Sequence, residues 1–132
     1  MEFVSDFNNI LLDFTLNIAH ICPNSLIGKN VSFVEKHINQ LNNPKSNNYT
    51  KLIDLFVEKV LVYKDKIDAG DEDFFLKKEY DNDLNGQSDL IGKVFEFKSI
   101  WRTLTQENKD CVIQYMQILC KLAQNYFMKT YN

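Results

Sequence analysis

The chain has 132 residues, a net charge of -3 and a pI near 5.3. A hydrophobic content of 45% with 13% aromatic residues supports a folded core and excludes a disordered chain, while four Gly and two Pro are too few for the repeated tight turns of a β-sandwich or barrel. From this composition we expect one all-α domain spanning residues 1–132. Its acidic net charge disfavours general nucleic-acid binding.

The first half of the chain predicts two helices separated by polar segments. Apolar residues recur at steps of three and four from Glu2 to Ile21, which predicts an amphipathic helix that ends before Pro23. A shorter helix is expected from Phe33 to Leu41. The Asn-rich segment 39–48 is typical of an exposed loop.

The middle of the chain predicts another amphipathic helix, from Thr50 to Asp68, with Gly70 as its end signal. Acidic residues dominate the segment that follows. The apolar run Phe74-Phe75-Leu76 within it is expected to form a short helical turn that packs inward.

The last third, 91–131, contains the only Trp and the longest helical pattern. We predict a helix that Ser88 or Asp89 caps and that runs to Arg102, then a break at 103–106, then a long helix from Gln106 to Tyr131. The expected architecture is a compact bundle of four or five helices, packed around Trp101 and the Phe74-Phe75 pair.

One segment resembles a cation-binding loop. Residues 81–89 read DNDLNGQSD, which matches the opening of a calcium loop, where oxygens at positions one, three and five converge. Position twelve, which should carry a bidentate Glu, is Gly92. We interpret the segment as an Asx-rich turn before a helix and keep a divalent-ion site as the alternative.

The cysteines and histidines suggest no metal or catalytic site. Cys22, Cys111 and Cys120 form an odd set without a C-x-x-C pair, which is typical of a reducing compartment, and their spacing from His20 and His37 matches no compact zinc pattern. No phosphate-binding or hydrolase motif is present, and the acidic run 71–73 is interpreted as a solvated loop. We therefore predict a non-enzymatic protein without catalytic, cofactor-binding or metal-binding residues.

The sequence carries no targeting signal that we recognise. The N-terminal apolar run contains Glu2, Asp6 and Asp13 and lacks a basic region, and no apolar run approaches the roughly 20 residues of a membrane span. We expect a cytoplasmic or nuclear protein without membrane contact.

The aromatic residues of the last third exceed what one helix stripe can bury. Surplus aromatics are typical of protein interfaces, although neighbouring helices can also enclose them. On the first interpretation the partner-binding residues are Phe97, Trp101, Tyr115, Tyr126 and Tyr131.

The segments SIWRTLTQENKDCVIQYMQILCKLAQNYF and VYKDKIDAGDEDFFL resemble a pattern in small uncharacterised helical proteins of giant DNA viruses, in which an Ile-Trp and an Asn-Lys precede an aromatic-rich terminal helix. The resemblance covers about the second half of the chain. It implies an intracellular viral product, made in an infected host cell, with no catalytic residue to carry over.

These observations favour a protein-interaction module that binds a protein partner or self-associates. One alternative is an accessory factor for nucleic acid or the transcription machinery, which requires a cluster of Arg102, Lys109, Lys121 and Lys129 on one exposed side. The other alternative is a regulatory protein that depends on a divalent ion.

Overall fold

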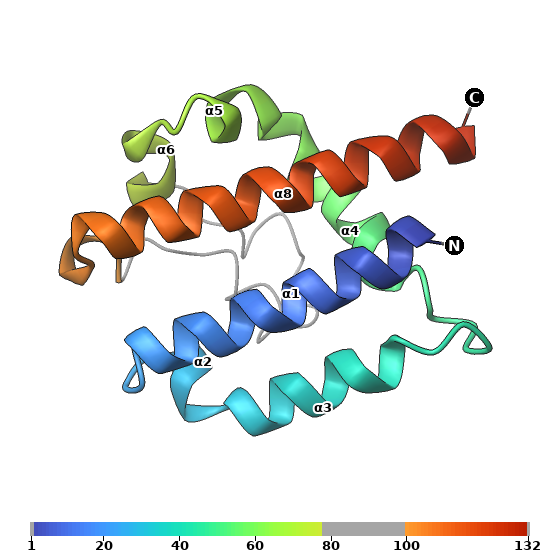
Figure 1. Cartoon of the computed structure of the whole chain (residues 1–132), viewed down its shortest axis with the longest axis horizontal. Helices are drawn as coiled ribbons and strands as arrows, with labels where there is room; N and C mark the ends of the chain where they lie inside the picture. The colour runs from blue at the N-terminus through green and yellow to red at the C-terminus, as the bar shows by residue number, and fades with distance from the viewer. Residues whose placement is uncertain (1, 78–99, 132) are drawn as a thin grey trace.

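The computed structural model describes residues 2–77 and 100–131, and over these ranges the chain is an all-α bundle (Figure 1). The predicted fold class is confirmed, including the long C-terminal helix. The described ranges contain more helices than the four or five expected, because several short helices lie between the long ones. The α-helices are α1 (Glu2–Ile21), α2 (Leu26–Lys29), α3 (Val31–Leu41), α4 (Lys51–Lys59), α5 (Lys64–Asp68), α6 (Glu72–Lys77) and α8 (Gln106–Tyr131). The 3-10 helices are η1 (Leu61–Tyr63) and η2 (Trp101–Thr103).

Helix α1 lies between α8 and α3 (Figure 1) and supplies the centre of the core. Its apolar face is buried at Val4, Phe7, Leu11, Phe14 and Ile18, whereas Phe3, Ile10 and Ile21 of the predicted stripe are only half-buried. The helix ends before Pro23, because a proline disfavours helical backbone in the preceding residue. Side-chain amides also tie α1 to the end of α3, since Asn8 donates to Asn42, which in turn donates to Asn9.

The predicted helix from Thr50 to Asp68 is interrupted, which corrects the sequence analysis. Helix α4 ends at Lys59, and Val60 leads into η1 before α5 begins. Val60 and Val62 are β-branched and lower the helix propensity of this stretch. The interruption leaves both α4 and α5 in contact with α8.

Gly70 ends α5 as predicted, in the left-handed conformation with a φ of 65°. The Gly70 amide donates to the Ile67 carbonyl at 3.0 Å and the Asp71 amide to the Lys66 carbonyl at 3.1 Å, the two hydrogen bonds of a Schellman motif. The turn leads directly into α6, where Phe75 is buried as expected. This short helix reaches η2, far along the chain.

The predicted break before the last helix is also confirmed. Leu104 has extended backbone between η2 and α8, and the Thr105 hydroxyl accepts from the Asn108 amide at 3.1 Å, which is an N-terminal cap. The buried residues of α8 follow a single stripe: Val112, Met116, Leu119, Cys120, Ala123 and Tyr126. The predicted helix leading to Arg102 falls outside the described residues except for its end, which forms η2.

Candidate functional site

Trp101 lies in the core. Its ring stacks on Phe75 with centroids 5.1 Å apart and planes 10° from parallel, and only 1% of the residue is exposed. The indole Nε1 donates to Glu72 Oε1 at 2.9 Å. Lys109 donates to the same oxygen at 2.8 Å and lies 5.7 Å from the centre of the indole ring. For Trp101, therefore, enclosure by neighbouring helices is the correct interpretation.

The acidic run 71–73 has a structural role in the described chain. Hydrogen bonds from Lys109 and then from Trp101 lower the pKa of Glu72 below its ordinary value, and this charged carboxylate joins α6, η2 and α8. Asp71 Oδ1 accepts from the Phe74 amide at the start of α6. Both carboxylates have polar partners that explain their positions.

Two further residues of the predicted surface face the bundle. Tyr115 is half-buried and stacks on Phe14 of α1, with centroids 5.0 Å apart. Tyr126 is buried, and its hydroxyl donates to Asp54 of α4 at 2.6 Å. Burial first, and then this hydrogen bond, raises the pKa of Tyr126 to about 12. Both tyrosines hold α8 against neighbouring helices.

Tyr131 is different, because 65% of it is exposed at the end of α8. Phe127, one helical turn earlier, is 43% exposed, and the two rings lie 5.0 Å apart. Met128 between them is also exposed. We call Phe127, Met128 and Tyr131 the C-terminal aromatic patch. Phe97, the remaining residue of the predicted surface, lies outside the described residues.

Phe127 falls beside the apolar stripe of α8, so the periodicity did not predict its exposure. The available signal was the spacing of four between Phe127 and Tyr131, which places both rings on one side of a helix. Because Cys120, two turns earlier on the same side of α8, is buried, helix periodicity alone does not predict that Phe127 is exposed.

The four basic residues of the nucleic-acid alternative do not share a side of the molecule. Lys109 lies against Glu72 and Trp101, whereas Lys129 lies 5.8 Å from the ring of Phe3 on α1. Arg102 is exposed on η2, directly after Trp101 in the chain, and Lys121 is exposed on α8. This arrangement forms no basic patch on α8.

The calcium-like segment 81–89 is not among the described residues. Within the residues that are described, no group of three or more His, Cys, Asp or Glu side chains is placed to hold a metal ion. No helix in those same ranges has the length and hydropathy needed to cross a membrane. The three cysteines are all unpaired.

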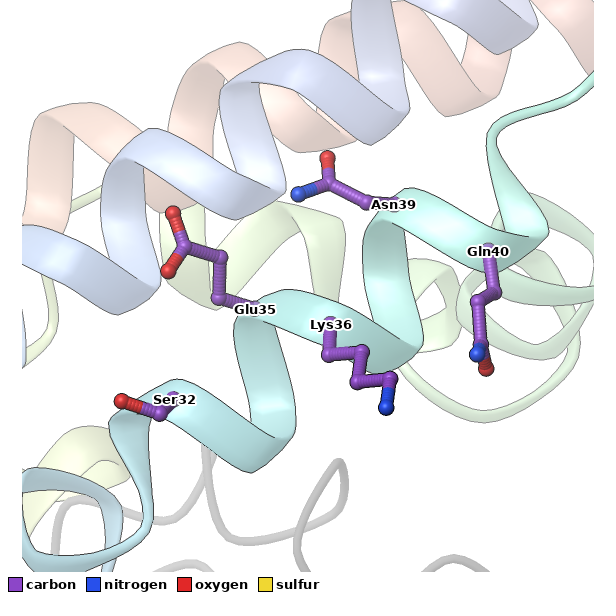
Figure 2. Close-up of a pocket in the computed structure, with 5 residues that line it drawn as sticks. All are labelled: Ser32, Glu35, Lys36, Asn39 and Gln40. Carbon is purple, nitrogen blue, oxygen red and sulfur yellow. The ribbon is translucent and has the colours of Figure 1, made fainter.

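A shallow hollow of about 430 Å³ lies along α3 and is lined by side chains of that helix alone: Ser32, Glu35, Lys36, Asn39 and Gln40. Figure 2 shows Glu35 and Asn39 pointing toward α1, whereas Lys36 and Gln40 point away from it. A small-molecule site requires polar groups that converge on one point, and the polar groups of this hollow do not.

Comparison of the chain with protein-family models, with curated proteins and with solved structures finds no match.

Proposed function

We propose that the protein is a non-enzymatic interaction module that binds another protein through the C-terminal aromatic patch. The observation that carries this proposal is the exposed ring pair of Phe127 and Tyr131. Aromatic residues are enriched among the side chains that dominate binding free energy at protein interfaces. A pair fixed on a helix also loses little conformational entropy on binding.

The location of the patch supports this role. Tyr126 anchors the preceding turn of α8 to α4 through Asp54, so the helix that presents the patch is held in place. The described acidic and basic side chains near Trp101 are engaged with one another, which leaves the aromatic patch as the better candidate for binding. The alternatives involving nucleic acid and a divalent ion gain no specific support from the described residues.

We place the protein in the cytoplasm or nucleus, where unpaired cysteines are stable. The resemblance of its second half to small helical proteins of giant DNA viruses extends the proposal to an infected host cell. No catalytic step is part of the proposed function.

The test is affinity capture with the purified full chain from lysate of the cell that produces it, followed by mass spectrometry. We expect a specific protein to be retained by the wild type and its retention to fall about tenfold or more with Tyr131→Ala or Phe127→Ala. Both substitutions should lower the melting temperature only slightly, because both side chains are exposed.

Val62→Ala is the matched control, since Val62 is an apolar side chain on η1 that is 71% exposed. It removes an exposed apolar group, smaller than an aromatic ring, without touching the patch. Equal retention by the wild type and the Tyr131→Ala and Phe127→Ala variants contradicts the proposal, as does a loss of retention with Val62→Ala.

A further inference from the structure

Helices α1 and α8 lie side by side (Figure 1), and a hollow of about 280 Å³ opens between them. Three aliphatic side chains line it, Ile10 from α1 and Ile118 and Leu122 from α8. Ile118 is 45% exposed there. Asp6 and Asn9 of α1 complete the lining. A groove between two helices that is lined mostly by aliphatic side chains suits the apolar side chains of another helix better than a polar ligand.

Opposite charges flank this groove at the level of Ile10 and Ile118, whereas Asp110, three turns before Lys121 on the same side of α8, is acidic and exposed. Asp6 and Asp13 are exposed on α1, four residues before and three residues after Ile10, so they share its side of the helix. Lys121 is exposed on α8, three residues after Ile118. Among the described residues, none forms an ion pair with Asp6, Asp13 or Lys121.

The helices run antiparallel, and this sets the level of each charge along the groove. Asn17 contacts Cys111 at one end, and Lys129 of α8 lies over the ring of Phe3 at the other. With a rise of 1.5 Å per residue, Lys121 falls between Asp6 and Asp13, about 5 Å along the axis from each.

We propose that the α1/α8 groove is a homodimer interface, in which α1 of each copy packs on α8 of the other. The two-fold axis then runs parallel to the helices, and each Lys121 faces Asp6 and Asp13 of the second copy. A two-fold interface must be self-complementary, and a groove with one acidic and one basic side meets this requirement. An axis across the helices instead places α1 on α1 and opposes like charges.

The size of the surface indicates a weak dimer. Helix α1 is about 30 Å long and two adjacent helices are about 20 Å wide, so the face covers about 600 Å² per copy, at the low end for specific complexes. We therefore expect the dissociation constant of the dimer to lie in the micromolar range. The charged residues of this interface, Asp6, Asp13 and Lys121, are separate from Phe127 and Tyr131 of the C-terminal aromatic patch, so either proposal can fail without the other.

The test is sedimentation velocity of the full chain, from micromolar concentration to about 1 mM. We expect wild type to shift from monomer to dimer over this range. Lys121→Glu gives one variant with acidic residues on both sides of the groove, and Asp6→Lys with Asp13→Lys gives another with basic residues on both sides. For each variant alone, the dissociation constant of the dimer should rise at least about tenfold, because the two-fold symmetry makes each reversed contact occur twice.

An equimolar mixture of the two variants should dimerise again, because the acidic groove of one matches the basic groove of the other. All three positions are exposed, so circular dichroism should show both variants folded with the melting temperature of wild type. A monomeric wild type overturns the proposal. So does a dimer that Lys121→Glu leaves unchanged, or a mixture of variants that stays monomeric.

Discussion

The two ends of α8 carry the same kinds of residue and use them differently. Near its start, Lys109 and the preceding Trp101 are held by Glu72 and Phe75, and the rings of Phe75 and Trp101 are both buried. At its end, Phe127 and Tyr131 contact each other and remain exposed. Aromatic content alone therefore does not identify a binding surface. The neighbouring elements decide which rings are covered.

The largest expected effect is at the covered end. Trp101→Ala removes a large buried ring together with the hydrogen bond to Glu72, and should lower the free energy of unfolding by about 3–5 kcal/mol. Urea denaturation of the full chain measures the change, with Val62→Ala as a control that should stay within about 0.5 kcal/mol of wild type. A loss below about 1 kcal/mol for Trp101→Ala means that the packing at this end is not as described.

A smaller effect is expected at Tyr126, where the covered and exposed parts of α8 meet. Tyr126→Phe keeps the ring and removes the hydroxyl that donates to Asp54, so we expect a loss of about 1 kcal/mol in urea denaturation. Asp54→Ala removes the acceptor, whereas Asn would keep a side-chain oxygen that can accept the same hydrogen bond. Double-mutant coupling near zero between the two positions contradicts a direct interaction.

Tyr126 also predicts a dependence on pH. Its pKa is raised to about 12, so the neutral form is favoured by folding. The contribution of the hydroxyl is fully present below the ordinary value of 10.0 and is lost as pH rises through about 12. The stability difference between wild type and Tyr126→Phe should therefore shrink between those two values. A constant difference rules out this linkage.

Glu72 should give the opposite dependence of stability on pH. The effect should be weaker than at Tyr126, because the Glu72 side chain is largely exposed and water screens its charge. Its pKa lies below the ordinary value of 4.5, so it stabilises the fold above that pH and stops doing so as pH falls. Glu72→Gln should flatten the acid side of the stability profile, measured by thermal unfolding from neutral pH downward. Val62→Ala, which changes no ionisable group, serves as the control and should keep the shape of the profile.

Local rules in the sequence were enough to predict most of the helices. Pro23 ends α1, Gly70 ends α5 and Thr105 caps α8, each through the backbone chemistry of one residue type. The interruption at Val60 was not predicted. It depends on how α4 and α5 both reach α8, which is a property of the assembled bundle.

The candidate site was harder to predict for the same reason. Periodicity places residues on one side of a helix but does not say whether another element covers that side. Trp101 is covered by Phe75, 26 positions earlier in the chain, and Tyr126 by α4, whereas no described element covers Tyr131. Of the five predicted residues, Tyr131 is the one that the described structure leaves available.

The smallest expected effect on stability is at the exposed end. Tyr131→Ala removes a ring whose described ring contact is Phe127, and an exposed pair spaced by four residues contributes about 0.2–0.5 kcal/mol. In urea denaturation, the free energy of unfolding of Tyr131→Ala should therefore lie within about 0.5 kcal/mol of wild type. Phe127→Ala should be slightly less stable than Tyr131→Ala, because Phe127 is less exposed. If Tyr131→Ala instead destabilises the chain as much as Tyr126→Phe, the end of α8 belongs to the core and the two ends do not differ. That result would contradict the proposal that the C-terminal aromatic patch is a binding surface.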